Sequence, residues 1–333
     1  MTSADTPKSL YEKKEDYFLV LDMPPGLWSR DGVQPPAAED ICAEWIDEKW
    51  LGHRAMVIHN AVSPSECQAM IDYCEGRVEG VEIPNALAEL PNREGLMIPA
   101  TVRTDYRNNL RVSSMAPDLA DILFQRIAPF LQDESKGISE GNVKIDASNA
   151  TLYEEGGIGI LGRWQMTGVN PCFRICKYHP NGHFGPHYDA EYFKSYTARS
   201  LKTFMIYLND DYTGGCTNFV ENHDLNFNKA TDRYEAPREA VRAQLKAKRG
   251  DILIFDHLLL HEGGTVHEGV KYIMRAEVMY ERAPAETDEE KRLERGYLLL
   301  YEAKRLEAEK DFEGAIAKYR AAFKVAPELE ANS

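Results

Sequence analysis

Long apolar runs are missing from this 333-residue sequence, so no segment is long enough to span a bilayer as a helix. Residues 1–18, MTSADTPKSLYEKKEDYF, also lack the apolar segment of a signal peptide. Cysteine is scarce, and the six cysteines, at positions 42, 67, 74, 172, 176 and 216, do not have the spacing of a disulfide framework. This usage suits a reducing compartment. We therefore expect a cytoplasmic protein without a membrane-bound segment.

Positive charge is in deficit. Lys and Arg number 39 against 54 Asp and Glu, which gives a net charge of -15 at pH 7. A body of this charge argues against an extended surface for nucleic acid or for an anionic membrane, and we expect neither partner. It does not exclude a local basic pocket. Hydrophobic residues make up 43% of the chain, which is ordinary for a globular fold with a full core.

The first half of the chain predicts an extension followed by a helical support. Residues 1–50 are polar and in places rich in proline, so we expect an N-terminal extension that lies over the body. RAMVIHNAV, residues 54–62, predicts a strand. Ser63 then opens a capping box with proline at the first helical position, which predicts a helix to about Cys74. A second helix should end near Pro129, and its amphipathic spacing comes from Leu119, Ile122, Leu123 and Ile127.

Beyond about residue 150, short apolar runs are separated by Gly, Asn and Asp. The predicted strands are CFRICKY, SLKTFMIYLN, CTNFVE, GDILIFD and KYIMRAEVMY. Many short strands with few helices predict a mainly β fold, an antiparallel barrel or jelly roll over about 150–283, supported by the helices of 51–149. The charged stretch at 223–248 interrupts the strands, and we expect a loop or lid there.

Residues 289–333 predict a helical hairpin with a break at KDFEG. Small and aromatic residues match the second helix of a tetratricopeptide repeat, at Ala315, Tyr319, Ala322 and Pro327. A lone repeat cannot bury both of its faces, so it must pack on the body or bind a protein partner. We expect packing on the body, with partner binding as the alternative.

The triplet His187-Tyr188-Asp189 follows a bend marked by glycine and proline, in NGHFGPHYDAEY. If the segment after Pro186 is extended, the side chains of His187 and Asp189 point the same way, because neighbouring residues of a strand alternate between faces. An imidazole and a carboxylate would then meet at one spot. A bare H-x-D triplet recurs by chance, so the prediction depends on a third ligand.

Three histidines downstream compete for the third position, namely His257, His261 and His267. We favour His261, because a Gly-rich turn follows it and a strand with a cation, Lys271, begins ten residues later. Two histidines and one carboxylate on one face of an iron leave three positions open, which is the arrangement that activates dioxygen at Fe(II). Zinc more often has a closed site or a single open position.

Three ordered segments carry a resemblance to a known family: YHPNGHFGPHYD, TFMIYLNDDYTGGCTNF and GDILIFDHLLLHEGGTVHEGVKY. They resemble the prolyl 4-hydroxylase-like branch of the Fe(II)/2-oxoglutarate dioxygenases, over roughly residues 100–282. The resemblance implies a double-stranded β-helix in a domain at 51–283. It implies Fe(II) bound by His187, Asp189 and His261, 2-oxoglutarate as cosubstrate, and ascorbate as a further cofactor.

The resemblance also implies a cosubstrate pocket. Lys271 has the family position of the cation that binds the distal carboxylate of 2-oxoglutarate. Arg275 shares its face of the strand, and it either is the anchor or assists it, since the family commonly has a small hydroxyl residue there. Tyr178 and Tyr207 have the positions of the two pocket tyrosines, and Thr203 shares the face of Tyr207.

The substrate that the resemblance implies is a prolyl residue in a protein or peptide, hydroxylated with release of succinate and CO2. Arg174 faces inward with Tyr178 and should meet either the substrate or a structural acid. The segments expected to hold the substrate are 97–111 and 223–248, with contacts from Arg103, Arg107 and Asn109. Alternatives are the same chemistry on a free amino acid or small metabolite, a zinc-dependent enzyme, or a non-catalytic binding module that acts through the C-terminal hairpin.

Overall fold

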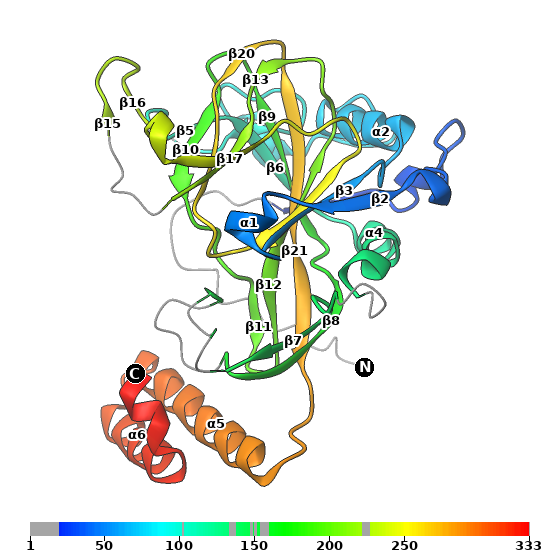
Figure 1. Cartoon of the computed structure of the whole chain (residues 1–333). Helices are drawn as coiled ribbons and strands as arrows, with labels where there is room; N and C mark the ends of the chain where they lie inside the picture. Colours follow the sequence, from blue (N-terminus) through cyan, green and yellow to red (C-terminus); the bar gives the residue numbers. More distant parts are fainter. Residues whose placement is uncertain are drawn as a thin grey trace.

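The computed structural model describes residues 20–101, 103–132, 138–146, 149, 152–153, 160–221 and 227–332 (Figure 1). Two β-sheets dominate this part of the chain, one of twelve strands and one of five. A core of buried side chains lies between the sheets, and a second core lies between the larger sheet and its helices. This is the mainly β jelly-roll architecture with flanking helices that the strand pattern predicts.

The larger sheet has the central order β1-β6-β9-β21-β12-β18-β3-β2. Its pairs are antiparallel, except for the parallel pair β1 and β6. The central strands are β1 (Val20–Asp22), β2 (Cys42–Trp45), β3 (Ala55–His59), β6 (Leu110–Met115), β9 (Cys172–Tyr178), β12 (Ala198–Tyr207), β18 (Ile252–Asp256) and β21 (Lys271–Arg282). Side pairs add β4 (Ile98–Pro99), β7 (Asn142–Ile145), β8 (Gly162–Val169) and β11 (Phe193–Ser195).

The smaller sheet has the order β17-β14-β19-β10-β5. Its strands are β17 (Val241–Leu245), β14 (Thr217–Val220), β19 (His261–Gly263), β10 (His183–His187) and β5 (Arg107–Asn108). The antiparallel register of β10 and β19 sets His187 directly opposite His261. Two residues that are 74 positions apart in the sequence (261 minus 187) thus become neighbours on adjacent strands. Two short pairs complete the β-structure, β13 (Thr213–Gly214) with β20 (Val266–Glu268), and β15 (Phe227–Asn228) with β16 (Arg233–Tyr234).

All ten residues of β12 are buried, because this strand has a core on each face. Phe204 and Ile206 belong to the core beneath the helices, whereas Met205 and Tyr207 belong to the core between the sheets. A central strand that is buried on both faces has a largely apolar sequence. This explains why polar residues do not alternate regularly with apolar ones in SLKTFMIYLN. The face with Met205 is the one that looks toward the site described below.

Helices α2 (Pro64–Cys74) and α4 (Pro117–Leu131) contribute buried residues to the core on the outer face of the larger sheet (Figure 1). The capping box predicted at Ser63 is present, with Glu66 as its reciprocal partner. The second helix continues past Pro129 to Leu131, because proline near a helix C-terminus removes few intrahelical hydrogen bonds. The shorter helical elements are α1 (Glu48–Leu51), α3 (Asn85–Ala88) and the 3-10 turns at Leu27–Ser29, Ala38–Asp40, Arg238–Ala240 and Pro327–Asn332.

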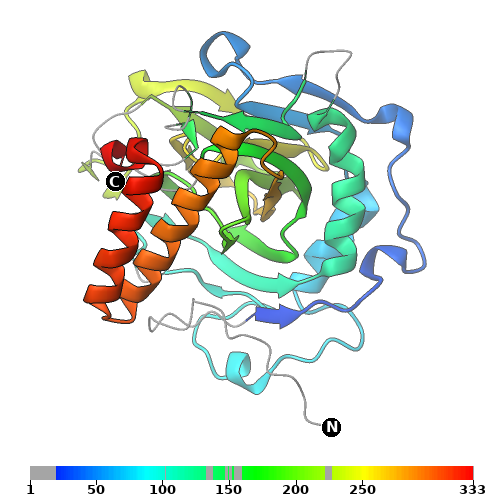
Figure 2. The ribbon, with the colours of Figure 1, turned by 90° about the horizontal axis from the view of Figure 1, so that it is seen from below.

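A helical hairpin, α5 (Asp288–Ala308) and α6 (Phe312–Val325), follows the last strand and lies against one end of the barrel (Figure 2). Tyr196, between β11 and β12, packs on Tyr297 of α5, with ring centroids 6.4 Å apart. Gly296 allows a close helix contact, since a Cβ there would lie 2.8 Å from the Cβ of Ala326. The hairpin therefore packs on the body, and its assignment to the tetratricopeptide class stays a prediction.

Parts of two segments that were expected to be an extension or a loop form strands. Residues 1–19 lie outside the described residues, and 20–50 contribute β1 and β2 to the larger sheet. The expectation of a loop or lid at 223–248 is wrong for Val241–Leu245, because these residues form β17 and pair with β14 at the edge of the smaller sheet. The polar residues of this strand, Arg242 and Gln244, are exposed and alternate with apolar ones, which is the pattern of a strand with one face in solvent. Residues 222–226 are not among those described.

No helix in the described part is both long and apolar enough to cross a membrane.

Candidate metal centre

Three side chains converge between the two sheets. His187 ends β10, His261 begins β19, and Asp189 follows two residues after His187. Each offers one ligand atom, and these atoms all lie within 4.8 Å of one another. The Nε2 atoms of His187 and His261 lie 3.5 and 3.7 Å from the carboxylate oxygens of Asp189. The predicted triad is therefore brought together, with His261 as its third member.

Both imidazoles are held in the tautomer that leaves Nε2 free to bind a metal. The Nδ1 of His187 lies 2.8 Å from the carbonyl oxygen of Gly185, and the Nδ1 of His261 lies 2.8 Å from that of Leu259. A carbonyl can only accept, so Nδ1 carries the proton in each ring and the lone pair is on Nε2. Burial, followed by the charge of His187, lowers the pKa of His261 to about 3, which keeps this ring neutral at neutral pH.

Asp189 is a buried carboxylate. One of its oxygens is held by a hydrogen bond, and the other is available to a metal ion. Its Oδ2 accepts a hydrogen bond of 2.6 Å from the hydroxyl of Thr203. Its Oδ1 lies 2.9 Å from Nη2 of Arg275, but no hydrogen bond of good geometry reaches it. Burial opposes ionisation, yet Arg275 and then the two imidazoles outweigh it and hold the pKa of Asp189 well below its usual range. Two imidazoles that present Nε2 and an ionised carboxylate with an unsatisfied oxygen fit a single divalent metal ion.

Two phenylalanine rings pack against the two imidazoles of the triad. Phe184 stacks on His187 with ring centroids 3.6 Å apart, and Phe255 meets His261 edge-on at 4.7 Å. Both phenylalanines line the cavity that contains the triad. Their packing restricts the rotation of the ligand rings, which preorganises the site for a metal.

A buried lysine lies in the same cavity as the triad. The Nζ of Lys271 donates to the carbonyl of Gly215 at 2.5 Å and lies 5.4 to 5.9 Å from the ring centroids of Tyr178, Tyr207 and Tyr212. It forms no ion pair with any of the described residues, although only 4% of its surface is exposed. Burial lowers its pKa to about 8. A buried ammonium without a counter-ion is costly, so this geometry favours an anionic ligand.

Of the two pocket tyrosines named from the sequence, Tyr178 lines the cavity, and both lie around the ammonium of Lys271. A third tyrosine beside this ammonium, Tyr212, was not anticipated. Tyr207 also hydrogen-bonds Thr217 through its hydroxyl at 2.7 Å. The signal for Tyr212 was present in NDDYTGG, since its turn of two glycines folds back over β21. Gly215 has a left-handed φ of +64°, which allows its carbonyl to face Lys271.

The two inward arginines have different partners. Arg275 pairs with Asp189, so it lies beside the triad rather than with Lys271. Arg174 forms an ion pair with Glu277, which also accepts 2.7 Å from the amide of Asn170. Of its two expected partners, Arg174 therefore meets the structural acid.

A third histidine, His257, belongs to the site, although its place in the sequence suggested only a turn residue. It is buried, and its Nδ1 lies 3.1 Å from the hydroxyl of Thr203 while its Nε2 lies 2.8 Å from that of Ser200. Burial lowers its pKa to about 3, so the ring is neutral. Thr203 donates to Asp189, so it accepts from Nδ1 of His257, and Ser200 then donates to Nε2. Nothing in the sequence spacing indicates this chain of hydrogen bonds.

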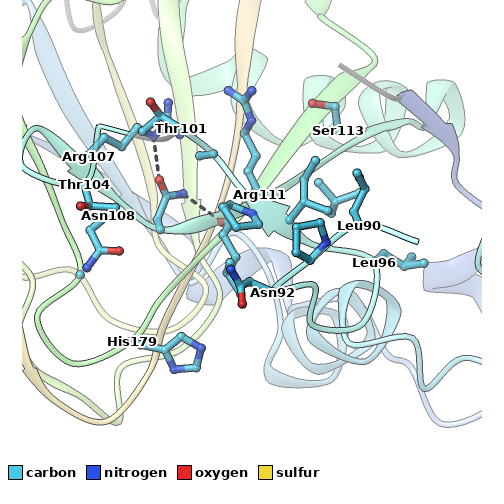
Figure 3. A pocket seen from close by; sticks show the side chains of 18 of the residues that line it. Leu90, Asn92, Leu96, Thr101, Thr104, Arg107, Asn108, Arg111, Ser113 and His179 are labelled. Carbon is cyan, nitrogen blue, oxygen red and sulfur yellow. Dashed lines mark hydrogen bonds between the residues drawn. The ribbon is translucent and has the colours of Figure 1, made fainter. Parts of the chain in front are cut away.

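Two of the remaining predicted contacts, Arg107 and Asn109, lie along a groove of about 890 Å³ next to the cavity (Figure 3). Arg107 lines both the groove and the metal cavity, and Asn109 accepts from its Nε at 2.7 Å. Arg103 is exposed and forms an ion pair of 2.9 Å with Asp105. The structure thus brings Arg107 and Asn109 to the site, while Arg103 stays at the surface.

A triad of two histidines and one carboxylate between the sheets of a jelly roll, with a buried cation beside it, is the arrangement expected of a mononuclear iron oxygenase. Residues 173–276 match the model of the 2OG-Fe(II) oxygenase superfamily. The match runs from β9 to β21 and includes all three triad residues. This match supports the resemblance at the level of the superfamily, and that superfamily implies Fe(II) and 2-oxoglutarate.

Solved structures that the chain is similar to include prolyl hydroxylases. One is the viral collagen prolyl hydroxylase of Paramecium Bursaria Chlorella virus-1 in complex with 2OG, at 17% identity, with 69% of this chain and 97% of that chain covered and a TM-score of 0.36. Another is a prolyl 4-hydroxylase of Pseudomonas putida, at 12% identity, with 71% and 96% covered and a TM-score of 0.38. At these TM-scores the similarity assigns no substrate. Among the curated proteins, nothing matches.

Proposed function

We propose that this protein is a hydroxylase that uses Fe(II) and 2-oxoglutarate to oxidise a C–H bond of a prolyl residue in a protein or peptide. Dioxygen, 2-oxoglutarate and R–H would give R–OH, succinate and CO2. The observation that supports the proposal most is the buried ammonium of Lys271, which has no counter-ion among the described residues and lines the same cavity as the triad. A dicarboxylate cosubstrate supplies one carboxylate for the metal and one for this lysine.

His187, Asp189 and His261 would hold the iron, which when bound supplies the capacity to activate dioxygen. Ascorbate would keep the iron reduced. His261, whose low pKa keeps its ring neutral, would bind through Nε2 without first losing a proton. His187 also presents Nε2 to the metal, because its Nδ1 donates to a backbone carbonyl. Asp189 binds as an anion, since its pKa is well below neutral pH. Three protein ligands leave room for a chelating cosubstrate and a third, exchangeable position.

Lys271 would bind the distal carboxylate of 2-oxoglutarate. The rings of Tyr178, Tyr207 and Tyr212 exclude water from its ammonium, which strengthens the ion pair by lowering the local dielectric. We assign Lys271 as the main anchor because Arg275 already pairs with Asp189. Thr203, proposed from the sequence as a cosubstrate contact, instead supports Asp189 through its hydroxyl.

A prolyl substrate is proposed on the family resemblance, and the groove beside the cavity is consistent with an extended peptide. The groove has apolar side chains, including Leu90, Leu96 and Ile98, which suit a pyrrolidine ring and its neighbours. Arg107 would contact the substrate at the junction of groove and cavity, with Asn109 holding its guanidinium. Arg174 and Arg103 have acidic partners of their own and are weaker candidates.

Succinate release tests the proposal. The purified protein is incubated with Fe(II), 2-oxoglutarate and ascorbate, first with proline-rich peptides and then with free amino acids. We expect a peptide to stimulate succinate release and to gain sixteen daltons, measured by mass spectrometry. Asp189→Ala and heat-treated protein are controls without turnover, and zinc in place of Fe(II) should not support the reaction. Stimulation by free amino acids alone would replace the peptide substrate by a small molecule.

A further inference from the structure

The second helix of the C-terminal hairpin has a side that the described residues do not cover. α6 packs on α5 and on the turn Pro327–Asn332. Its Ala322 belongs to the small core that contains Tyr297 and Leu300 of α5. In Figure 2, α6 lies at the edge of the molecule, with α5 between it and the barrel. The side of α6 that points away from α5 therefore faces solvent.

Two large apolar side chains lie on this open side. Phe312 is 60% exposed and Ile316 is 50% exposed. They are four residues apart, so they are neighbours on the helix surface. The next turn adds small residues, since Ala317 is exposed and Ala321 is half-buried. A single exposed apolar residue is normal, but two large ones side by side mark a surface that another molecule can cover.

Two charged residues on the same side have no partner of opposite charge. Glu313 and Arg320 are both exposed, and neither forms an ion pair with a described residue. They are seven residues apart, which is about 10 Å along the helix axis and too far for an ion pair within one chain. Their neighbour Lys318, in contrast, pairs with Glu302 of α5. Glu313 and Arg320 are thus available to a second molecule.

The order of these charges makes the surface complementary to itself. In a dimer with a two-fold axis, each contact between two different residues forms twice. If two copies of α6 pack antiparallel about an axis between Ile316 and Ala317, Glu313 of one copy faces Arg320 of the other. In a parallel pair, each of these charges would instead face its own copy, and like charges repel. The charges therefore favour the antiparallel arrangement.

The same register fits the apolar side chains. Ile316 faces the partner's Ala317, and Phe312 faces the partner's Ala321. Large side chains thus meet small ones, which allows the two helices to approach closely. Acid opposite base and large opposite small are satisfied together in one register.

We propose that this side of α6 is a dimerisation surface and that it binds α6 of a second copy of this chain, antiparallel and about a two-fold axis. The proposal goes beyond the oxygenase function, since none of the three triad residues lies in the hairpin. A helix of 14 residues is about 21 Å long, so one pair of such helices is at the small end of specific interfaces. We therefore expect a weak dimer, with a Kd of about 1 to 100 μM.

Sedimentation equilibrium of the purified full chain tests the proposal, because it measures mass without reference to turnover. The wild-type protein should change from monomer to dimer between about 1 and about 200 μM. Ile316→Ser removes an apolar contact at a position that is half exposed in the monomer. The Tm of this variant should stay within about 2 °C of wild type, while the Kd rises about tenfold or more.

Charge reversal tests the pairing that the two-fold axis requires. Arg320→Glu gives the surface two acids, and Glu313→Arg gives it two bases. Each variant alone should dimerise at least about tenfold more weakly than wild type, because like charges then face each other. An equimolar mixture, with one variant labelled by a fluorescent dye, should form a heterodimer with a Kd within about threefold of wild type. Acid again faces base at both positions in that heterodimer.

Lys304→Glu is the control for a change of net charge, because Lys304 is exposed on α5 and not on α6. It should leave the Kd unchanged. A wild-type chain that stays monomeric up to the highest concentration would overturn the proposal, as would a dimer that Arg320→Glu does not weaken. A mixture that fails to associate, although both variants keep the wild-type Tm, would also overturn it and leave the surface to a different protein. None of these outcomes depends on succinate release, so the oxygenase function is tested separately.

Discussion

At the scale of single residues, the metal ligands depend on side chains that do not touch the metal. Asp189 is oriented by Thr203, Thr203 by His257, and His257 by Ser200, in a chain of hydrogen bonds from 2.6 to 3.1 Å. The backbone amide of Tyr192 donates to Ser200 at 2.7 Å and closes the chain. Each hydroxyl in the chain donates one hydrogen bond and accepts one, and each ring nitrogen of His257 has a single role. The chain therefore fixes one orientation of the carboxylate.

Removing the hydroxyl of Thr203 tests this chain. Thr203→Val keeps the shape but leaves Oδ2 of Asp189 and Nδ1 of His257 without their shared partner. We expect the affinity for Mn(II), used as a stable substitute for Fe(II), to fall about tenfold to a hundredfold. Isothermal titration calorimetry measures it. Thr203→Ser keeps the hydroxyl and should stay close to wild type. Equal affinity in the valine variant would mean that the chain of hydrogen bonds has no influence on the metal.

The buried Lys271 predicts a pH dependence for the cosubstrate. Its pKa in the folded protein is about 8, below the ordinary 10.5, because burial disfavours the ammonium. The proton is therefore lost as pH rises through 8, and affinity for 2-oxoglutarate should fall by up to about tenfold per pH unit above that point. Between pH 8 and 10.5 the unfolded chain holds more protons at this residue than the folded one, so its contribution to stability rises with pH in the same window.

The dissociation constant of 2-oxoglutarate, measured with Mn(II) from pH 7 to 9.5, checks this prediction. Lys271→Met should weaken binding at pH 7 and remove the dependence above pH 8. Lys271→Arg, which keeps its charge over this range, should also remove the dependence while retaining part of the affinity. A wild-type profile that is flat up to pH 9.5 would show that another cation binds the distal carboxylate.

At the scale of elements, two short strands and one turn make the site. β10 and β19 are adjacent in the smaller sheet, so their register alone sets His187 opposite His261. The turn after β18 adds His257, whose carbonyl accepts 3.1 Å from the amide of Asp189. A shift of one residue in the register would turn His261 to the other face of the sheet and separate the triad.

The C-terminal hairpin contributes no residue to the triad or to the cavity around it, among the residues that the structure describes. Tyr297 is its main contact with the body, being 3% exposed and packed on Tyr196. Tyr297→Ala should destabilise the hairpin by about 3 kcal/mol, because it leaves a cavity in the small core that joins the hairpin to the body. Amide hydrogen exchange should then rise in 288–332 but not in 173–276.

A surface residue of the same helix provides the control. Leu298→Ala, at a position 44% exposed, should change stability by less than about 0.5 kcal/mol. Substrate-stimulated succinate release should be unchanged in both variants if the hairpin has a structural role. Loss of turnover in Tyr297→Ala with a folded oxygenase domain would contradict this and point to the hairpin as a working surface.

At the scale of the whole molecule, ligand binding and folding are linked. The metal and cosubstrate bind only the folded protein, since their ligands come from strands that are distant in the sequence. At a hundred times the dissociation constant, Mn(II) should stabilise the protein by about 2.7 kcal/mol, and 2-oxoglutarate should add to this. Differential scanning calorimetry measures the rise in Tm. Asp189→Asn should abolish the metal-dependent part, and a rise of equal size in that variant would place the metal elsewhere.

The net charge of the whole molecule does not describe the charge of its interior. A net charge of -15 predicts no polyanionic partner, and yet several cations lie in the interior near the triad. Amino-acid composition gives the number of charges but not their positions. The pairing of β6, β9 and β21 places Arg111, Arg174, Arg275 and Lys271 on one face of the larger sheet.

Much of this protein follows from the sequence by itself, because some physical signals are local. Such signals depend on residues that are only a few positions apart in the sequence. Examples are the capping box at Ser63, the strands of 172–178 and 252–256, and the spacing of His187 and Asp189. The mainly β fold follows from the same repeated pattern. The choice of His261 over its competitors depended on a Gly-rich turn nearby and on the family resemblance.

Only the tertiary structure decided the rest, because those features depend on contacts between distant segments. Arg275 could bind either the cosubstrate or Asp189 until β21 was placed beside the triad. His257 looked like a turn residue until burial gave it two hydroxyl partners. Val241–Leu245 looked like part of a loop until pairing with β14 made it an edge strand. Charge and polarity are visible in a sequence, but the partner that each group meets is a property of the folded chain.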